Sequence, residues 1–367
     1  MEYLFVIQGE GRGHFTQALS LKSMLERNGH TVVAIMVGCS AQRALPGFII
    51  DITNTEVIRF QSPNFLPSPK GKKSFLLASI LYNLLLVPTY IASLFKIKRT
   101  ISKKQPDIVV NFYELLCGIT YGVFNPKVPM INVAHQYYFL TPDFNYTGKN
   151  VLQFKLLNFY SRLTALNASK ILALSFRAKE SSLNKDITIV PPLLRQEVLR
   201  QKSTIGNYIH GYLLNSGYVT ELIKWSEFNL YERLHFFWDK RNVDESVNLT
   251  YLLTMHTLDD KLFLEYMAGA KAYATTGGFE SVCEAMYLQK PVLMVPTHIE
   301  QECNVIDAMK SGAGVSANGF DLNLLLNFIP TYNGFNEFKY WVQTGEYIFL
   351  QELTQQEYVQ SNIYAAL

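Results

Sequence analysis

A glycine-rich turn that ends in histidine follows the first apolar stretch of the chain. Residues 9–14 read Gly-Glu-Gly-Arg-Gly-His, directly after the apolar run 3–8 and before a segment with helical periodicity. Glycines let the backbone turn tightly, and a helix start offers unpaired N–H groups to an anion or an oxygen atom. The unperturbed pKa of histidine, about 6.5, suits proton removal from a hydroxyl at neutral pH. We therefore predict that His14 is a general base; the alternative is that it caps its own helix.

A second glycine turn lies in the run 275–285, Thr-Thr-Gly-Gly-Phe-Glu-Ser-Val-Cys-Glu-Ala. A strand ends there and a helix begins, whose N-terminus favours a phosphate group. Glu280 and Glu284 are four residues apart and share one face of that helix. A carboxylate one turn into such a helix can accept both ribose hydroxyls, and Glu284 is the better candidate for this role. For Glu280 we favour a first-turn carboxylate that complements the helix dipole.

A polar loop follows the next predicted strand, with the sequence Pro-Thr-His-Ile-Glu-Gln-Glu-Cys-Asn at 296–304. It would stand beside the second glycine turn, at the same edge of a sheet. A carboxylate and amide pair such as Glu300 and Gln301 can hydrogen-bond vicinal sugar hydroxyls. The alternative is that this loop only caps the helix that runs to Met309.

Strands alternate with helices along both halves of the chain, which predicts an α/β fold with parallel, doubly wound sheets. The pattern restarts after 190–192, so we expect two Rossmann-like domains that face each other across a cleft. Domain bounds are placed at 1–188 and 189–335, with a helical segment, 336–367, packing back across both. In such sheets ligands bind beyond the carboxyl ends of the strands. The predicted strands are 3–8, 31–37, 107–112, 130–133 and 171–175, then 207–214, 234–238, 249–252, 272–275 and 291–295.

These motifs resemble the GT-B glycosyltransferases, in particular the family 28 and family 1-like branch. That branch contains the bacterial peptidoglycan GlcNAc transferase and the related glycolipid and natural-product glycosyltransferases. In this family a glycine-rich first loop ends in histidine, a Gly-Gly-x-x-Ser…Glu-Ala…Pro segment holds the nucleotide, and an Asp/Gln-Gln-x-x-Asn loop holds the donor sugar. The chain departs from the pattern at Thr276, where many relatives have histidine, at Glu280, where they have asparagine, and at Glu300.

The resemblance implies that the first domain binds an acceptor and the second a nucleotide-diphosphate sugar. It places Arg195, in Pro-Leu-Leu-Arg, near the diphosphate, and assigns ribose binding to Glu284. Donor-sugar contacts are implied for His298, Glu300 and Gln301. The predicted acceptor side consists of Gly11, Arg12 and Gly13 together with His135 and Gln136 from Ala-His-Gln. The remaining predicted nucleotide contacts are Ser216, Gly217, Thr276, Gly277, Gly278, Phe279 and Ser281.

We expect a hexosyltransferase-type reaction that inverts the anomeric carbon and needs neither a metal nor a cofactor, the nucleotide sugar being a co-substrate. His14 or, as a second choice, His135 would deprotonate the acceptor hydroxyl. Uridine is the expected base from the resemblance alone. The acceptor stays open: a glycan, a glycolipid or a small molecule. Alternatives are a sugar-nucleotide 2-epimerase of the same fold, which would use carboxylates, and a non-catalytic nucleotide-sugar binding protein.

The composition bears on the binding partners and on the cellular compartment. Lys and Arg are spread along the chain and the net charge is +3, which argues against nucleic acid as a partner. The four cysteines lie far apart, with no metal-like spacing and no signal peptide before them, as expected of a cytoplasmic protein with reduced thiols.

An uncharged apolar run at 74–95 has lysines on both sides. Three interpretations are open for it. One is a membrane span, which its length alone permits. Another is peripheral contact between 74–104 and the inner face of an anionic membrane. The third is a pair of helices broken at Pro88 and buried in the first domain.

Overall fold

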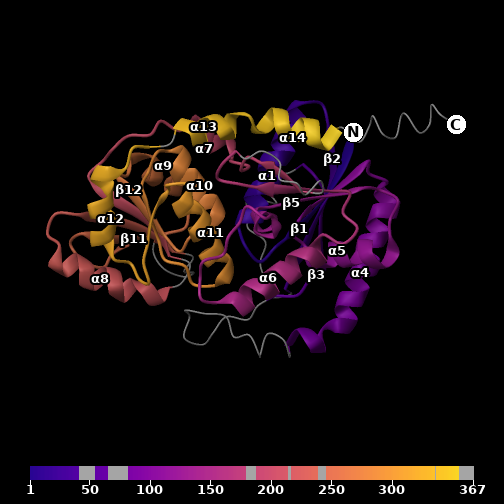
Figure 1. Ribbon diagram of the computed structural model, residues 1–367, viewed down its shortest axis with the longest axis horizontal. Helices are drawn as coiled ribbons and strands as arrows, with labels where there is room; N and C mark the ends of the chain where they lie inside the picture. Colours follow the sequence, from indigo (N-terminus) through magenta and orange to yellow (C-terminus); the bar gives the residue numbers. More distant parts are fainter. Residues whose placement is uncertain are drawn as a thin grey trace.

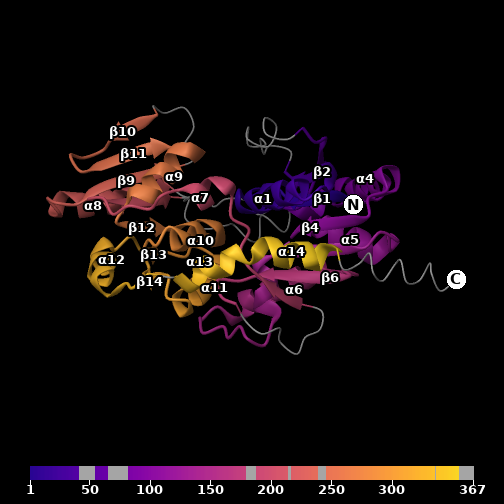
Figure 2. The same cartoon turned by 90° about the horizontal axis from the view of Figure 1, so that it is seen from above.

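The chain forms two parallel-dominated sheets side by side, each flanked by helices (Figures 1 and 2). The computed structural model describes residues 1–40, 54–64, 82–178, 187–213, 216–238, 245–334 and 336–354. The first sheet has the strand order β3-β2-β1-β4-β5-β6-β7 and the second β10-β11-β9-β8-β12-β13-β14. Both sheets read outward from a central strand in two directions, as doubly wound sheets do. The prediction of two Rossmann-like units is confirmed.

Every neighbouring pair of strands in the first sheet is parallel. Alternate residues of β1 face opposite helical layers: Tyr3 and Phe5 pack with α1 and the C-terminal helices, whereas Leu4 and Val6 pack with α4 and α5. Both faces of the sheet are therefore covered and its strands are apolar throughout. The strands are β1 (Glu2–Gln8), β2 (Thr31–Cys39), β3 (Val57–Gln61), β4 (Ile108–Phe112), β5 (Met130–Ala134), β6 (Lys170–Leu174) and β7 (Ile187–Val190). The helices are α1 (Gly13–Arg27), α4 (Val87–Lys104), α5 (Leu115–Phe124) and α6 (Val151–Thr164), with a 3-10 helix η1 (His135–Leu140).

The second sheet is parallel except at its edge, where β10 pairs with β11 in the antiparallel sense. Its strands are β8 (Tyr208–Leu213), β9 (Arg233–Trp238), β10 (Ser246–Asn248), β11 (Leu253–Thr257), β12 (Ala272–Thr275), β13 (Val292–Met294) and β14 (Gly314–Ser316). Its helices are α8 (Val219–Phe228), α9 (Asp260–Gly269), α10 (Phe279–Tyr287), α11 (Ile299–Lys310) and α12 (Leu322–Phe328).

The predicted strand at 249–252 is wrong, because these residues form the turn of the β10–β11 hairpin. The hydroxyl of Thr250 accepts hydrogen bonds from the backbone N–H groups of Leu252 and Leu253, at 3.3 and 3.1 Å. Such side-chain-to-backbone bonds favour a turn even in an apolar stretch. The strand itself begins at Leu253.

The boundary drawn between residues 188 and 189 falls inside β7, which belongs to the first sheet and ends at Val190. The C-terminal helices α13 (Asn336–Gln343) and α14 (Gly345–Thr354) then return from the second domain to the first (Figure 1). The indole N–H of Trp341 donates to the carbonyl of Ser175 at 3.0 Å. Glu346 and Glu352 form ion pairs with Arg27 and Lys170 of the first domain. Residues 355–367 lie outside the described part of the chain.

The apolar run 74–95 is described only from residue 82 onward. A short helical turn ends at Leu86, and α4 begins at Val87 with Pro88 in its first turn, where proline is tolerated. Within α4 the buried side is formed by Tyr90, Ser93, Ile97 and Ile101. Several of the other apolar side chains face solvent: Leu84, Leu85, Val87, Ile91 and Phe95 are exposed. The described part of the run is thus two helical segments that meet next to Pro88, as one interpretation expected, but they are only half-buried. No helix among the described residues is long and apolar enough to cross a membrane.

Candidate active site

His14 lies at the start of α1, where the first domain meets the second. Its Nδ1 atom is 3.4 Å from Oε1 of Gln17, one turn further along the same helix. The amide of Gln17 in turn donates from Nε2 to the carboxylate of Glu280, which comes from α10 of the second domain. The two domains therefore meet in a chain of three polar side chains, His14, Gln17 and Glu280, at the carboxyl end of β1.

Burial shifts the pKa values of His14 and Glu280, the two outer members of this hydrogen-bonded series. It lowers the pKa of His14, against opposing effects of the Glu300 carboxylate and the Gln17 hydrogen bond. It raises the pKa of Glu280 to about 7, with the nearby carboxylates of Glu300 and Glu284 adding to the rise. His14 is thus neutral at neutral pH, the form in which an imidazole accepts a proton.

Tyr113 supports the other side of the His14 ring. The two rings stack with their centroids 5.7 Å apart and an interplanar angle of 26°, and the tyrosine hydroxyl is bonded to the Ser161 hydroxyl at 2.7 Å. Tyr113 follows β4 directly and has a φ of +59°. Left-handed backbone at a non-glycine residue costs free energy and is held in place by its surroundings. The strained backbone thus fixes a ring against the candidate base.

His135 lies in a different setting and does not suit the role of second base that the sequence suggested. Its side chain is almost fully buried, and its Nδ1 donates to the carbonyl of Leu174 at 2.6 Å. Its ring stacks on Phe279 at 3.9 Å between centroids, with further aromatic rings around it. Burial lowers the pKa of His135 to about 3. His135 and Phe279 pack against each other across the domain junction, and nucleotide binding by Phe279 stays a prediction.

The second glycine turn forms as predicted between β12 and α10. Gly277 has a φ of +84°, and Gly278 is the N-cap residue of α10. A Cβ atom at position 277 would lie 2.7 Å from Cγ2 of Val305. Asn304 donates from its side chain to the Gly277 carbonyl at 3.2 Å, which ties the turn to α11. The turn needs glycine both for its backbone conformation and for space.

We predict that Gly277→Ala lowers the free energy of unfolding by about 1–3 kcal/mol, because the left-handed backbone and the contact with Val305 both oppose a Cβ atom. Urea denaturation followed by circular dichroism measures the change. Gly11→Ala is the matched control: a Cβ there meets nothing within 4 Å, and we expect a change within about 0.5 kcal/mol. Equal effects of the two substitutions would refute this account of the turn.

Glu284 and Arg195, predicted to bind ribose and diphosphate, are paired with each other. The guanidinium of Arg195 donates from Nε and Nη2 to the two carboxylate oxygens of Glu284, at 2.7 and 3.1 Å. Asp260 lies 3.7 Å from the same guanidinium and accepts two hydrogen bonds from Arg12, at 2.8 and 2.7 Å. The first glycine loop is thus linked to the second domain through a chain of alternating charges.

The loop before α11 contributes one buried and one interdomain side chain. Gln301 is buried; it donates to the Thr276 hydroxyl at 3.2 Å and accepts from the N–H and hydroxyl of Thr297. It therefore fastens this loop to the second glycine turn. Glu300 accepts from the Gln136 side chain of the first domain at 3.0 Å. The predicted donor-sugar residues Glu300 and Gln301 are adjacent in the chain but face different neighbours.

The remaining predicted residues are placed as follows. His298 is the N-cap residue of α11 and is exposed. Ser281 donates from its hydroxyl to the Gly278 carbonyl at 3.2 Å, in the first turn of α10. Ser216 and Gly217 lie in a single 3-10 turn after β8, and the preceding residues 214–215 fall outside the described part of the chain. Gly13 lies against the Glu280 carboxylate, which leaves no room for a side chain there.

Three residues of this site were not singled out from the sequence: Gln17, Tyr113 and Asp260. Gln17 follows His14 by three residues, and this helical spacing is a signal that could have found it. Tyr113 stands directly after a buried strand, where ligand-binding residues are expected. Nothing local marks Asp260, because it acts through partners in distant parts of the chain. Among the described residues no group of histidine, cysteine and acidic side chains could hold a metal ion.

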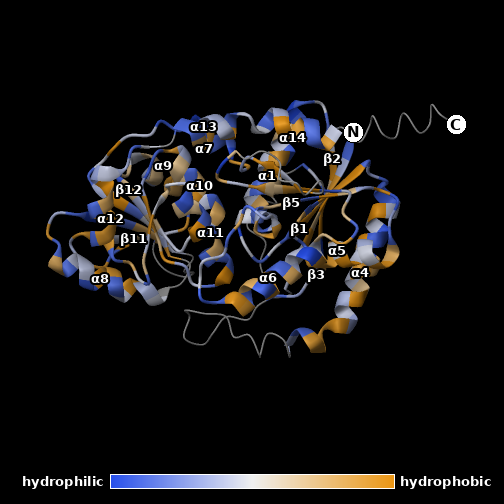
Figure 3. Cartoon of the chain, in the orientation of Figure 1, coloured by the Kyte–Doolittle hydropathy of each residue, from blue (hydrophilic) through white to orange (hydrophobic). Residues whose placement is uncertain are grey.

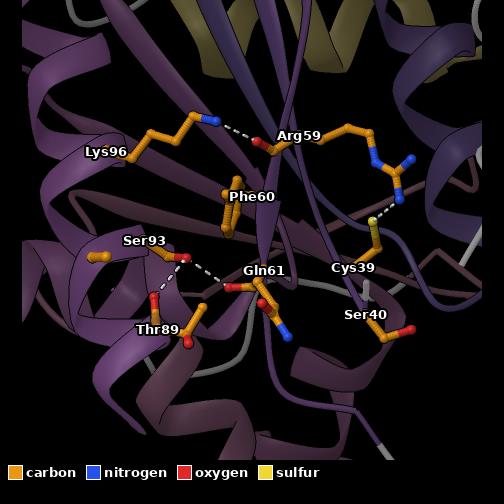
Figure 4. A pocket seen from close by; sticks show the side chains of 9 residues that line it. Cys39, Ser40, Arg59, Phe60, Gln61, Thr89, Ser93 and Lys96 are labelled. Carbon is orange, nitrogen blue, oxygen red and sulfur yellow. Dashed lines mark hydrogen bonds between the residues drawn. The ribbon is translucent and has the colours of Figure 1, made fainter. Parts of the chain in front are cut away.

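A pocket of about 410 Å³ lies between the ends of β2 and β3 and helix α4 (Figure 4). It is lined by residues at the ends of β2 and β3 and by the inner side of α4, among them Cys39, Arg59 and Lys96. Lys96 donates to the Arg59 carbonyl at 2.6 Å, and the Arg59 guanidinium reaches the Cys39 sulfur at 3.4 Å. The backbone of Ser40, also in the lining, donates to the carboxylate of Glu10 in the glycine loop at 2.6 Å. The pocket and His14 thus share the carboxyl edge of the first sheet.

Comparisons with known proteins agree on one class. A sequence model described as glycosyl transferase family 1 matches residues 1–331. A search of curated proteins finds no match. Among solved structures, the glycotransferase of kitacinnamycin has a TM-score of 0.62 at 13% identity, over 94% of this chain and 95% of that one. The calicheamicin glycosyltransferase CalG4 has a TM-score of 0.62 at 14% identity, over 96% and 97%. Arabidopsis thaliana UGT89C1 in complex with UDP-L-rhamnose has a TM-score of 0.62 at 13% identity, over 96% and 98%. These likenesses show that the fold is GT-B.

Proposed function

The chain belongs to glycosyl transferase family 1, and from this premise we propose that it transfers a sugar from a UDP-sugar to an acceptor hydroxyl with inversion and without a metal. The observation that carries the proposal is the position of His14. It stands at the junction of the domains, held by the Gln17 side chain that bonds Glu280 in the first turn of α10. UGT89C1, which is similar in fold, is described in complexes with UDP and with UDP-L-rhamnose.

The proposed reaction needs one proton acceptor and one stabilised leaving group. Nε2 of His14 takes the proton of the acceptor hydroxyl, whose oxygen attacks the anomeric carbon of the donor. The bond between that carbon and the β-phosphate oxygen breaks, and UDP leaves with the electron pair. The N-terminus of α10, which begins after Gly278 and has no side-chain cap, and the guanidinium of Arg195 stabilise the negative charge that develops on the diphosphate.

We assign the other site residues by their positions relative to His14 and to the start of α10. Glu284 accepts from the ribose hydroxyls, in exchange for part of its present bonding to Arg195. Thr276 and Ser281 lie at the turn that would receive the phosphates. His298 and Glu300 stand at the start of α11, where the donor sugar would lie, with Gln301 holding that loop in place.

A product assay tests the function directly. Purified protein is incubated with UDP-glucose, UDP-galactose or UDP-N-acetylglucosamine and a panel of hydroxyl acceptors, and the products are resolved by mass spectrometry and NMR. Transfer with an inverted anomeric centre, undiminished by a chelator, is the expected result. The carboxylates of Glu280 and Glu300 near His14 favour the 2-epimerase as second candidate. An isomerised sugar without transfer would select it, and binding without turnover would indicate a non-catalytic protein.

We further propose a cytoplasmic enzyme that contacts the membrane peripherally through α4, within the predicted segment 74–104. Helices α4, α5 and α6 lie next to one another over one face of the first sheet and carry no aspartate or glutamate. Figure 3 shows apolar residues along α4 and α6. The exposed apolar side chains of this face are Leu84, Leu85, Val87, Ile91, Phe95, Val123, Val151, Leu152, Leu156 and Phe159. The cations on the same helices are Lys96, Lys98, Arg99, Lys103, Lys104, Lys155 and Arg162.

Three neighbouring helices with exposed apolar and basic side chains match the surface of an anionic bilayer, although one of the cations, Lys104, is paired with Glu56 at 2.6 Å. The pocket beside α4 would then open toward a membrane-borne acceptor. A glycan or a free small molecule as acceptor would need no such face, so vesicle binding favours a glycolipid over the other two acceptor classes proposed from the sequence.

The membrane contact predicts that Leu84→Ser/Leu85→Ser weakens binding to phosphatidylglycerol-containing vesicles at least about tenfold, because two exposed leucines no longer enter the bilayer. Co-sedimentation measures the bound fraction. Phe228→Ser, at an even more exposed apolar residue of α8 in the second domain, is the control and should bind like the wild type. Equal co-sedimentation of all three proteins, or no binding of the wild type, would refute the contact.

A further inference from the structure

We infer that Gln17 and Glu280 are positioning residues that hold His14 in the tautomer able to act as a base, so that the second domain prepares the base of the first. This inference rests on the proposed role of His14 as the base. It gives Glu280 a role beyond the one favoured from the sequence, which was to complement the dipole of its own helix. It also gives a role to Gln17, which was not singled out from the sequence.

The two ends of the Gln17 amide face different partners, Glu280 and His14. An amide group donates only through its nitrogen and accepts only through its oxygen. A carboxylate accepts, so the end of Gln17 that faces Glu280 is the nitrogen, Nε2. The oxygen then faces His14, 3.4 Å from Nδ1. Because an amide oxygen needs a donor, Nδ1 of His14 carries the proton and Nε2 keeps its lone pair. That lone pair is what the proposed reaction requires.

The packing holds Gln17 and Glu280 in this arrangement. Gln17 is 1% exposed, so its amide has no water with which to exchange partners. Glu280 reaches across the domain junction and lies against Gly13, the first residue of α1. The start of α1 has no acidic residue of its own and no side-chain cap, and a carboxylate is favoured there by the helix dipole. While Glu280 is ionised, it therefore has one stable position and Gln17 has one orientation.

The charges around Glu280 make the arrangement sensitive to pH. Glu284 of the same helix and Glu300 at the start of α11 face it from the second domain, and both oppose its ionisation. From the first glycine loop, His14 faces it through Gln17; of the loop's other charged groups, Arg12 is engaged by Asp260 and Glu10 by the Ser40 backbone. Arg195 faces Glu284, and Cys283 lies beside Glu280 with its own pKa raised.

Protonation of Glu280 would reverse the direction of the two hydrogen bonds that link Glu280, Gln17 and His14. The pKa of Glu280 is raised to about 7 by its burial, so the carboxylate gains a proton as the pH falls through 7. A protonated carboxyl donates, and Gln17 then satisfies it by presenting its oxygen. The nitrogen of Gln17 would turn to His14, Nδ1 would become the acceptor, and the proton would move to Nε2. His14 would lose its function as a base at a pH where it is still uncharged, since its own pKa is lowered.

The tautomer of His14 can be observed without any assay of transfer. In ¹⁵N-histidine-labelled full-length protein at pH 8, we expect the His14 signals of an Nδ1-protonated, Nε2-unprotonated ring. Gln17→Met, which fills a similar volume and neither donates nor accepts strongly, should shift these signals toward a mixture of the two tautomers. An unchanged spectrum in Gln17→Met would overturn the inference even if the protein is an active transferase. A fixed His14 tautomer in a protein without transfer activity would contradict the proposed function, but the inferred positioning of His14 by Gln17 and Glu280 would still hold.

Kinetics give the second measurement. Gln17→Met should lower kcat by about 10²-fold, the lower end of what a general base contributes, with little change in the KM of the donor. Glu280→Gln keeps an acceptor oxygen that cannot titrate. It should retain more activity than Glu280→Ala, and its activity should fall at a lower pH than that of the wild type, whose acid limb lies near pH 7. If the acid limb of Glu280→Gln coincides with that of the wild type, Glu280 only caps α1 and the inference is wrong. Should Gln17→Met fail to fold, this pH comparison decides alone.

Discussion

His14→Ala should lower kcat for sugar transfer by about 10²–10⁴-fold, the range that a general base contributes. The imidazole at the start of α1 is neutral because burial lowers its pKa, and Tyr113 and Gln17 hold it on two sides. Alanine leaves no group at this position that can take the acceptor proton. Initial rates at saturating donor and acceptor measure the loss, and the KM of the donor should change little because His14 belongs to the acceptor side.

The matched control is His30→Ala. His30 directly precedes β2, at the opposite edge of the first sheet from the glycine loop, and its substitution should leave the transfer rate unchanged. Thermal unfolding of both variants separates lost chemistry from lost structure. Full transfer activity in His14→Ala would show that another group is the base. His135, whose Nδ1 is bonded to the Leu174 carbonyl in an aromatic enclosure, would then still be unsuited to replace it.

Arg195→Met should lower the free energy of unfolding by about 3 kcal/mol or more, because it leaves the carboxylate of Glu284 buried without its partner. The Glu284 side chain is 4% exposed and that of Arg195 21%. Removing one member of a buried pair costs about 3–5 kcal/mol, since the remaining charge is not solvated. Urea denaturation gives the value, and the same variant should lose most of the thermal shift that UDP produces in the wild type.

Two further variants serve as comparisons for the stability of Arg195→Met. Arg195→Met/Glu284→Leu removes both charges, and we expect it to recover most of the lost stability but not the response to UDP. Arg27→Met breaks a pair in which both side chains are more than two-fifths exposed, and it should cost no more than about 1 kcal/mol. If Arg195→Met is no more destabilising than Arg27→Met, the pair does not have the buried character described above.

The sequence predicted much of the fold because its signals are local. Buried strands read as short apolar runs, and β12 was predicted with the bounds it has in the structure. The glycine turns before α1 and α10 were recognised because backbone conformation and close packing there leave little choice of residue. The predicted strand at 249–252 was wrong because hydrogen bonds to the Thr250 hydroxyl stabilise a hairpin turn within this apolar stretch. The bound predicted between residues 188 and 189 falls inside β7, a strand of four residues that was not among the predicted strands.

The sequence by itself determined two doubly wound sheets, the glycine turns at their carboxyl edges and the presence of His14 beside one of them. Only the tertiary structure decided which side chains meet across the domain junction. Gln17 and Glu280 are 263 residues apart and Arg195 and Glu284 are 89, and no periodicity connects such pairs. Burial is likewise a property of the packed domains. It enclosed His135, left His14 neutral at the junction and raised the pKa of Glu280, because the free energy of a charge depends on everything that surrounds it.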